Sequence, residues 1–388
     1  MIAHLFKLIW NRKKQNFLLM LEMFVSFIVM FGVFTLCVNY YLNYRKTRGF
    51  EYRDVWAVNY GLPPEVKNAD SVRLILGSLK SLIASQPQVH NLTFTGGNIP
   101  YSNNTYNTSI GYQEKDMMSH IYTADLMYPR VLGIEMESGE WKADERGGKA
   151  GIVINSTLKQ NLFGNDRAEG KEIKIDNELF KVSGVVKDFK SAGDYQAVEN
   201  GIFKIPDTIE RGQDLIMLKV KPGTDASFEA RLHKIVSGFS RNTTVEVEHL
   251  EKKRTAKNNM TLIPMLIFLL VSAFLIINVA LGLFGVLWYN ISRRKGEIGL
   301  RRAIGASSGA ISWQVSGETL SIATISVLVG VFFAVQFPLL NVFDMASNVY
   351  FTAIVLSVIF MYLLVLVCSL YPARQASAID PAIALHEE

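Results

Sequence analysis

The chain has 388 residues, of which 49% are hydrophobic and 19% are charged. The mean hydropathy of +0.18 is on the membrane side of the range for soluble globular proteins, and this composition excludes a disordered chain, a collagen and a disulfide scaffold. Cys37 and Cys368 both lie inside long apolar runs, so the sequence offers neither a disulfide framework nor a cysteine-based metal site.

Four apolar runs are each long enough to cross roughly 30 Å of hydrocarbon as a helix. They cover residues 17–38, 261–289, 319–340 and 349–370, and none contains a lysine or an arginine. The first run follows a basic start, as a secretory signal would, but it is too long for the apolar part of a signal peptide and no small-residue cleavage site follows it. We therefore expect an uncleaved anchor and four transmembrane helices in all.

The distribution of lysine and arginine predicts the side on which each connection lies. Residues 1–16 carry four cations and no acidic group, and residues 290–316 carry five cations against Glu297 alone, so both are expected in the cytoplasm. The short 341–348 connection carries Asp344 and no cation, so it is expected outside.

These assignments leave two segments to place. The tail, 371–388, follows the fourth run and is expected in the cytoplasm, whereas residues 39–259 form a large domain outside. Basic and acidic residues nearly balance in this outer domain. It also lacks the interleaved basic and aromatic residues of a nucleic-acid interface, so no nucleic-acid partner is expected.

Hydrophobic periodicity predicts a β-α-β unit near each end of the outer domain. Together, over about 45–100 and about 200–250, the two units predict one split α+β subdomain that resembles a ferredoxin-like sheet. In chain order the expected elements are a strand over 54–60, a helix capped by Asp70, a strand over 89–95, a strand over 215–220, a helix over 227–239 and a strand over 243–247.

The middle of the outer domain, about 101–199, predicts an inserted, mostly β subdomain. Within it, 151–155 is typical of a strand that leads into a short helix capped by Ser156. The 172–186 stretch alternates as a hairpin around Asp176 and Asn177. The expected fold class is an α-helical membrane protein with four transmembrane helices and a large α+β extracytoplasmic domain.

No catalytic motif stands out in the sequence. The 164–172 stretch resembles a phosphate-binding loop, but it has five residues between its glycines where the motif has four, and Glu172 where a magnesium-binding serine or threonine must stand. The six histidines are scattered without an i,i+4 pair. We therefore expect no enzymatic activity, no metal and no bound cofactor in this chain.

Two segments beside the spans carry a resemblance. From Arg293 the sequence reads RRKGEIGLRRAIGASSGAI, and the tail reads YPARQASAIDPAIALHEE. Both resemble the MacB/FtsX family of ABC-transporter permeases, and the outer stretch 151–186 is similar to the MacB-type periplasmic core domain. The matching positions beside the spans are Glu297, Ile298, Gly299, Arg302, Ala303, Gly305, Ala306, Glu318, Pro372, Ala373, Arg374, Ala376, Pro381, Ala384 and Leu385.

This resemblance implies a multi-pass permease of the bacterial inner membrane, with both termini cytoplasmic and the large domain periplasmic. It implies a homodimer or heterodimer that works with a separate cytoplasmic ABC ATPase, and that ATPase would bind the ATP and magnesium. Motion driven by ATP would pass through the spans to the periplasmic domain. An efflux version would also have a periplasmic adaptor and an outer-membrane duct as partners.

The cytoplasmic loop 290–316 is the predicted contact with the ATPase. Small residues let its backbone pack closely against another surface, arginines offer charge-assisted contacts, and Glu297 can pair with Arg293 or Arg301 along a helix. The positive-inside rule alone explains the cations but not the glycine and alanine spacing. The predicted coupling residues are Arg293, Arg294, Glu297, Ile298, Gly299, Arg301, Arg302, Ala303, Gly305 and Ala306.

Polar and small residues inside the spans have structural interpretations. Glu22 lies roughly 8 Å from the start of the first run, so we expect it to reach the interface or pair with a basic neighbour rather than relay protons. Gly282, Gly285 and Gly330, the last with Ala334, suit close packing between helices.

Three alternative functions share some of these features. A lipoprotein-extracting permease has the same topology, and so does an FtsX-like regulator of a cell-wall hydrolase, although its outer domain is usually smaller. A membrane-anchored ligand sensor would normally carry a cytoplasmic output domain. Neighbouring genes discriminate among them: an ATPase with an adaptor and a duct favours efflux, and a hydrolase favours signalling.

Overall fold

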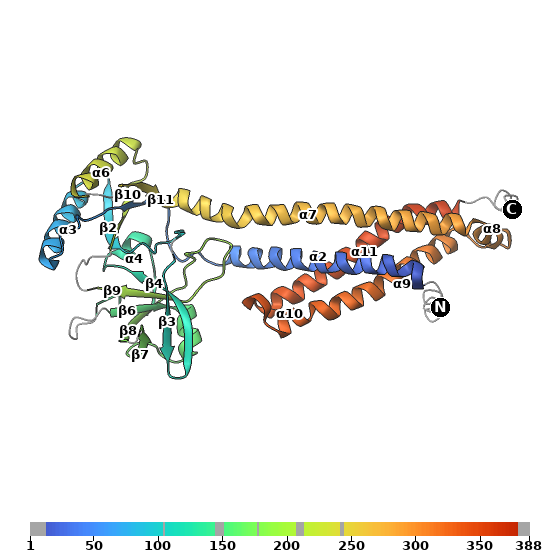
Figure 1. Ribbon diagram of the computed structural model, residues 1–388, viewed down its shortest axis with the longest axis horizontal. Helices are drawn as coiled ribbons and strands as arrows, with labels where there is room; N and C mark the ends of the chain where they lie inside the picture. The colour runs from blue at the N-terminus through green and yellow to red at the C-terminus, as the bar shows by residue number, and fades with distance from the viewer. Residues whose placement is uncertain are drawn as a thin grey trace. The chain divides into compact units, whose positions relative to one another are not determined.

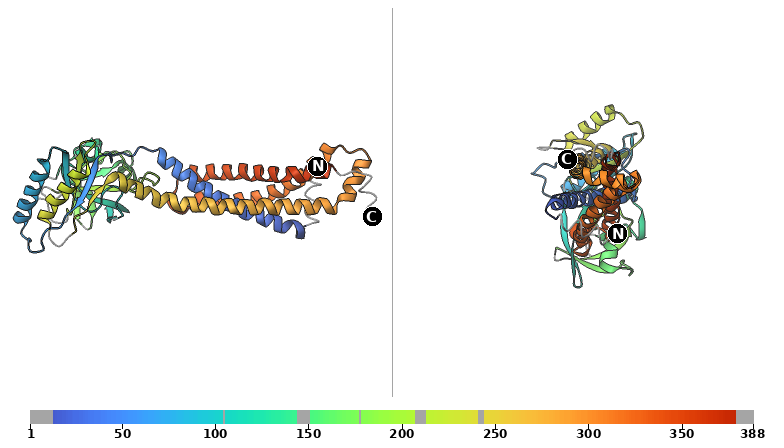
Figure 2. Two further views of the ribbon diagram at one scale, coloured as in Figure 1. Left: turned by 90° about the horizontal axis from the view of Figure 1, so that it is seen from above. Right: turned by 90° about the vertical axis from the view of Figure 1, so that its right-hand side faces the viewer.

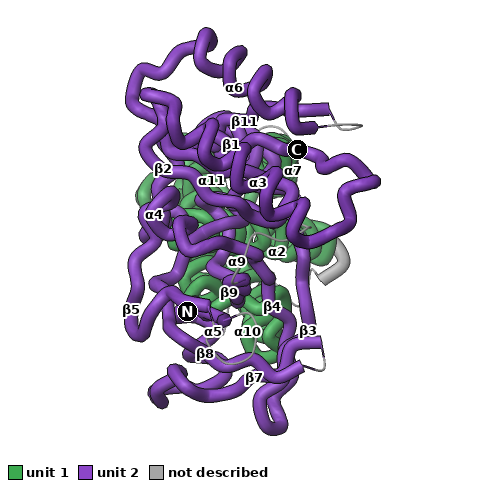
Figure 3. Tube along the Cα trace, turned by 90° about the vertical axis from the view of Figure 1, so that its left-hand side faces the viewer, with its two compact units in different colours: residues 1–42, 263–388 green, residues 43–262 purple. Residues whose placement is uncertain are grey.

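The computed structural model divides into two compact units (Figure 3). The membrane unit comprises residues 1–42 and 263–388, and the outer unit comprises residues 43–262. The structure describes residues 13–103, 105–143, 151–176, 178–206, 213–240 and 244–378.

Within these ranges, four helices are long and apolar enough to cross a membrane, which confirms the expected number of spans. They are α2 (Lys13–Arg45), α7 (Leu250–Arg293), α9 (Ser308–Ala334) and α11 (Ser347–Ser377) (Figure 1). The helices α2, α7 and α11 extend beyond their apolar runs at both ends, because hydropathy marks only the part that suits lipid. The helix α9 begins before the expected 319–340 span but ends at Ala334, and α10 covers most of the remainder of that span. The beginning of the 1–16 segment and the end of the tail, including Pro381, Ala384 and Leu385, lie outside the described residues.

Most of the expected cytoplasmic connection over 290–316 is helical, as the expected i,i+4 pairing of Glu297 requires. The long helix α7 continues to Arg293, and the short helix α8 (Lys295–Ala303) follows it. The next helix, α9, already begins at Ser308, because the hydroxyl of Ser307 caps it by accepting from the Ala310 N–H at 3.2 Å. The expected 341–348 connection likewise holds the 3-10 helix η1 (Val342–Asp344), just after α10 (Gln336–Leu339).

The four long helices share an apolar core in the membrane unit. Gly330 of α9 lies directly against the buried ring of Phe27 of α2. Gly282 of α7 lies against the Glu22 carboxylate, since a Cβ added there would come within 2.5 Å of Glu22 Oε1. Among the described residues, Gly285 has no such neighbour within 4 Å, so close packing is observed at Gly282 and Gly330, whereas for Gly285 it stays a prediction. Other buried members of this core include Met23, Phe31, Leu283, Ala323, Val327, Tyr350, Ala353 and Met361.

The first sheet of the outer unit has the strand order of a ferredoxin-like fold. Its order is β11-β1-β10-β2, and every neighbouring pair is antiparallel. The helices α3 (Ala69–Ala84) and α6 (Ala226–Phe239) lie side by side on one face of the sheet (Figures 1 and 2). The strands are β1 (Val55–Asn59), β2 (Val89–Thr95), β10 (Leu215–Val220) and β11 (Val247–His249).

Local details differ from the sequence expectation at three places in this sheet. The side chain of Asn68, rather than that of Asp70, caps α3 by accepting from the Asp70 and Ser71 N–H groups. The carboxylate of Asp225 caps α6, which therefore begins one residue earlier than expected. The last strand, β11, begins only at Val247, the last residue of the expected 243–247 segment.

The second sheet of the outer unit is a closed barrel. Its order is β5-β8-β6-β9-β4-β3-β7, and an additional pairing of β7 with β8 closes the ring. Closure depends on the long strand β8, whose first half pairs with β7 and whose second half pairs with β6 and β5. The strands are β3 (Asn107–Tyr112), β4 (Lys115–Thr123), β5 (Met136–Gly139), β6 (Gly151–Asn155), β7 (Glu172–Ile175), β8 (Glu178–Val186) and β9 (Gly201–Ile205).

The strand β9 corrects an expected boundary. The sequence assigns residues from about 200 onward to the ferredoxin-like subdomain, but β9 pairs with β4 and β6 of the barrel. The insert therefore extends to Ile205, and the ferredoxin-like half resumes at Leu215. The short helix α5 (Ser156–Phe163) is present as expected, although the side chain of Asn155 caps it instead of Ser156.

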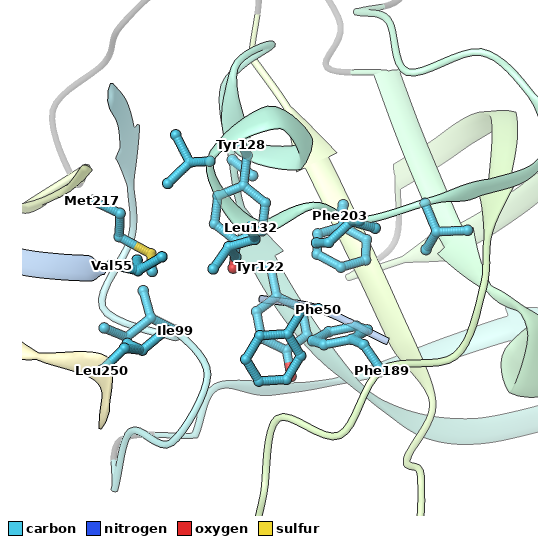
Figure 4. Close-up of a cluster of buried hydrophobic side chains, with 14 of the residues drawn as sticks. Phe50, Val55, Ile99, Tyr122, Tyr128, Leu132, Phe189, Phe203, Met217 and Leu250 are labelled. Carbon is cyan, nitrogen blue, oxygen red and sulfur yellow. The ribbon is translucent and has the colours of Figure 1, made fainter. Parts of the chain in front are cut away.

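A shared hydrophobic cluster joins the two sheets of the outer unit. Val55 and Met217 contribute from the ferredoxin-like sheet, Phe203 contributes from the barrel, and Tyr128 contributes from α4 (Tyr128–Leu132) (Figure 4). Alternate residues of β6 point in opposite directions, so Val153 faces this shared cluster. Its neighbours Ile152 and Ile154 instead face a separate hydrophobic cluster of the barrel. The two subdomains therefore form one folded body.

Candidate functional site

The predicted coupling residues extend from Arg293, at the end of α7, through α8 to the turn that joins α8 to α9. We call residues 293–307 the coupling segment. The inner face of α8 is fixed by packing, because the buried side chain of Ile298 joins a small cluster with Ile311 of α9 and Ala376 of α11. Gly299 is buried beside it, and Ala306 packs partly buried against the same cluster. A nine-residue helix is too short to be stable alone, so this packing holds it.

A ring of polar contacts ties α8 to the start of α9. Glu297 accepts from Arg301 Nη2 at 2.6 Å, which confirms the expected i,i+4 pair, and Arg301 Nη1 donates to Gln314 Oε1 at 2.5 Å. The amide of Gln314 donates to Glu318 at 3.2 Å, and Glu318 accepts from Arg294 Nη1 at 2.7 Å. The ring closes where Arg294 Nε lies 3.9 Å from Glu297.

This polar ring lines one end of a cavity of about 70 Å³. Apolar side chains also line the cavity, including Leu19 of α2, Leu287 of α7 and Ile322 of α9. The two arginines and two glutamates of the ring balance in charge. Three of the predicted coupling residues, Arg294, Glu297 and Arg301, therefore already have partners within the chain, and their contacts fix the orientation of α8.

The glycine in the turn has a local structural reason. Gly305 has φ of +99°, in the region that favours glycine. The Ala306 N–H donates to the Arg301 carbonyl at 3.0 Å, and the Gly305 N–H donates to the Arg302 carbonyl at 3.1 Å. These two bonds form a Schellman motif, which ends α8 and sends the chain back into α9.

A third contact joins the coupling segment to the end of α11. The guanidinium of Arg302 donates to the Ser377 carbonyl oxygen, and the Ser308 hydroxyl donates to the same oxygen at 3.3 Å. The last carbonyl groups of a helix lack partners within it, and a cation there also complements the helix dipole. Arg302 therefore stabilises the end of α11.

The outer face of α8 is exposed and apolar. The exposed fraction is 54% for Leu300 and 78% for Ile304, and that of Trp313, near the start of α9, is 74%. Ala303 and Gly305, which flank Ile304 in the chain, are also exposed, and Arg293 is exposed at the end of α7. An apolar face held on a fixed helix is suited to binding another protein surface.

The sequence interpretation missed Leu300, Ile304 and Trp313, although a signal for two of them exists. Leu300 follows Ile298 by two positions, which is about 200° around a helix, so the two side chains must face opposite directions. Since Ile298 is buried, Leu300 faces outward, and Ile304, four residues later, faces the same way. Gln314 was also missed, because only the folded chain brings it to Arg301.

The 164–172 stretch has the wrong surroundings for a phosphate-binding loop. It follows the short helix α5 and precedes β7, whereas a phosphate-binding loop leads from a strand into a helix. Lys171 pairs with Asp166 at 3.1 Å and lies 4.8 Å from the ring centroid of Phe163. Among the residues with described positions, no group of three histidine, cysteine or acidic side chains could hold a metal ion.

The fold and the coupling segment define a multi-pass membrane protein with a large outer α+β domain. Its sequence matches the MacB-like periplasmic core domain over residues 46–235 and the FtsX-like permease C-terminal domain over residues 268–381. The chain therefore belongs to the MacB/FtsX family of ABC-transporter permeases. This assignment fits an inner-membrane protein with a periplasmic domain.

Relatives with curated names share a low sequence identity. The macrolide export ATP-binding/permease protein MacB of Bdellovibrio bacteriovorus is 23% identical over 334 residues, which cover 81% of this chain and 49% of the relative. The protein of the same name from Campylobacter jejuni is 27% identical over 257 residues, which cover 61% of this chain and 39% of the relative. The chain thus spans half the length of these relatives or less.

Solved structures also resemble part of this chain. The periplasmic region of MacB from Actinobacillus actinomycetemcomitans matches with a TM-score of 0.39 and 14% sequence identity. The match covers 55% of this chain and 97% of that structure.

Proposed function

We propose that this chain is the permease subunit of an export system, and that it transmits motion from a separate cytoplasmic ABC ATPase to its periplasmic domain. The ATPase would bind the ATP and magnesium, and the chain itself would hydrolyse nothing. In this proposal the coupling segment is the docking site. The name of the two MacB relatives, which states macrolide export, supports the export direction.

One observation carries the proposal. The helix α8 presents Leu300 and Ile304 to solvent while Ile298 and the polar ring fix its opposite side to α9 and α11. A docked partner that moves such a helix must also move the spans to which it is fixed. An unattached loop would absorb the same displacement.

The α7 span supports a dimer within the same proposal. Only 6% of its apolar stretch is buried, against 33% in α2, α9 and α11. Large side chains such as Leu270, Phe274 and Leu281 are exposed along it. We propose that a second permease copy, identical or related, covers part of this surface and lipid covers the remainder. A periplasmic adaptor and an outer-membrane duct would complete an efflux assembly.

The direct test is co-purification of the full chain with an ABC ATPase encoded beside it. We expect a stable complex whose ATP hydrolysis differs from that of the ATPase alone. If each such ATPase remains separate from a folded permease, the proposed function is wrong.

The topology gives a separate prediction, which rests on the distribution of cations. In a variant with Cys37→Ala and Cys368→Ala, a cysteine at exposed Thr105 should react with a membrane-impermeant maleimide from the periplasmic side. A cysteine at exposed Ser308 should react only after the inner membrane is opened. The reverse labelling pattern would contradict the proposed orientation.

The substitution Lys171→Ala tests whether the 164–172 stretch binds nucleotide, as its resemblance to a phosphate-binding loop would require. We expect the ATP hydrolysis of the assembled complex to stay within about twofold, because the lysine contacts Asp166 and the ring of Phe163 within the outer unit, and an exposed ion pair contributes about 0–1 kcal/mol. The measurement is steady-state ATPase activity beside a variant of the ATPase motor site. A comparable loss in folded Lys171→Ala protein would show that this loop binds nucleotide.

A further inference from the structure

The segment between β8 and β9 contains two almost fully buried charges. We call residues 187–200 the latch segment. Its Lys190 and Asp194 are 2% and 3% exposed, although the segment forms no helix or strand. Buried charges are costly unless they are paired and hydrogen-bonded, so their partners show what the segment is built to hold.

The carboxylate of Asp194 receives contacts from three separate parts of the outer unit. Arg254, in the first turns of α7, donates to Oδ2 through Nε at 2.8 Å and Nη2 at 2.5 Å. Asn258, one turn later, donates to the same oxygen at 3.0 Å. Arg48, which follows α2, donates to Oδ1 at 3.2 Å, and the Tyr101 hydroxyl donates to that oxygen at 3.4 Å.

These contacts hold the carboxylate in its charged form. Burial by itself raises the pKa of Asp194, but hydrogen bonds from Arg254 and Asn258, together with the charges of Arg254 and Arg48, lower it below its ordinary value. The two arginines also lie over one aromatic ring, with guanidinium carbons 4.6 and 4.7 Å from the ring centroid of Tyr52. Asp194 is therefore the centre of a preformed ionic cluster.

The latch segment also holds the end of α2. The ammonium group of Lys190 donates to the Asn43 carbonyl oxygen in the last turn of that helix, and it also donates to the Asp194 carbonyl oxygen at 3.2 Å. The ring of Tyr195 stacks on that of Tyr44, with the centroids 5.4 Å apart. A cation suits this position, because the last carbonyl groups of a helix carry partial negative charge.

On the other side, the latch segment holds the beginning of α7. Besides the Asp194 contacts, the Asp194 N–H donates to Asn258 Oδ1 at 3.0 Å and the Gln196 amide donates to the Thr261 hydroxyl at 3.1 Å. A single short segment therefore binds the outer ends of the two helices that connect the outer unit with the membrane unit.

The latch segment continues directly into the barrel. It follows β8 and precedes β9, and both strands flank β6 in the sheet. Asn155, at the end of β6, fixes the point where the latch segment joins β9. Its side-chain amide N–H donates to the Glu199 carbonyl at 2.8 Å, and its side-chain oxygen accepts from the Gly201 N–H at 3.0 Å. A displacement of the latch segment would therefore act directly on three adjacent barrel strands, β8, β6 and β9.

We propose that the latch segment, held by Asp194, passes displacements of α2 and α7 to the barrel strands β8 and β9. This inference rests on the proposed function, since it requires motion driven through the spans. Ionic and hydrogen-bonded contacts can exchange partners as the helices shift, whereas the packed barrel core must move as a body. Asp194 is thus a positioning residue for the transport cycle.

Hydrogen exchange tests the proposal in the full chain, assembled with its ATPase in lipid nanodiscs. In the parent protein, a non-hydrolysable ATP analogue should change exchange at least tenfold over 250–262 and over 201–205. In Asp194→Asn, which keeps the size of the side chain but removes its charge, the change over 250–262 should remain and the change over 201–205 should fall at least fivefold. A purely structural role would raise basal exchange and leave the nucleotide-dependent ratio intact.

Further variants separate the outcomes. Arg254→Lys keeps the charge but loses the forked contact, so it should lose part of the response even if Asp194→Asn does not fold. Glu51→Gln is the matched control, because it breaks the 2.8 Å pair with Lys219 elsewhere in the outer unit and should leave the response intact. If either folded variant of the latch segment keeps the full response over 201–205, the proposed role of the latch segment is wrong.

The parent protein separates this proposal from the proposed function. If the parent responds over 250–262 but not over 201–205, only the proposed role of the latch segment is wrong. If the nucleotide analogue changes exchange in neither region of the parent protein, the proposed function is contradicted, and so is the proposed role of the latch segment.

Discussion

Replacing Ile304 with glutamate should abolish co-purification of the permease with its ATPase. The side chain is 78% exposed at the end of α8, where it lies beside Leu300 on the proposed docking surface. A buried apolar anchor of this kind typically contributes about 2–4 kcal/mol to binding, so the complex should weaken roughly 30- to 700-fold. The measurement is affinity capture of the ATPase, together with export or resistance in cells.

The structure makes Ile304 a cleaner probe than the residues the sequence favours. A bulky residue in place of Gly305 would strain a backbone with φ of +99° and could disrupt the turn without any partner. Arg302→Glu would remove the contact with the Ser377 carbonyl and so loosen the end of α11. Ile304 packs against little of its own chain, so its loss should leave insertion and folding unchanged.

Ala310→Glu is the control for the added negative charge. It places the same charge at an exposed position in the first turn of α9, where a helix N-terminus accommodates it. This control should retain the complex. If Ile304→Glu and Leu300→Glu both form a complete, active complex at normal expression, the coupling segment is only a topogenic cluster and the docking assignment fails.

Sequence periodicity predicted most of the architecture because the signal is local. The four spans and the β-α-β units each follow from the spacing of apolar residues within a single element. The boundary of the insert did not follow, because β9 reads as a short apolar strand that could join either sheet. Only its pairing with β4 and β6, far away in sequence, assigns it to the barrel.

The candidate site was predicted as a segment but not as an arrangement. Sequence spacing predicted the Glu297–Arg301 pair, since both residues lie on one helix. It could not predict that Arg301 also binds Gln314 across a turn, or that Arg302 contacts the end of α11. The same limit applies to Arg48 and Arg254, two cations of the outer unit, of which the first follows α2 and the second lies in the first turns of α7. Both pair with the buried carboxylate of Asp194, which composition cannot reveal.

Replacing Gly330 with alanine should destabilise the membrane unit markedly. A Cβ at this position of α9 would overlap the ring of Phe27, which is fully buried, so the ring or the helices must shift to admit it. Overpacking of a filled core costs about 1–3 kcal/mol, which outweighs the gain of roughly 1 kcal/mol expected when alanine replaces glycine within a helix. Leucine at the same position should cost more than alanine.

Gly317→Ala is the matched control on the same helix. Apart from its chain neighbours and its own helix backbone, no atom of the described residues lies within 4 Å of the position its Cβ would take, so the helix preference dominates and this variant should be as stable as the parent or slightly more stable. Thermal unfolding of both variants in one detergent gives the comparison. If Gly330→Ala melts at or above the temperature of Gly317→Ala, then α2 and α9 do not pack through Phe27 and Gly330, and the arrangement of the membrane core must be revised.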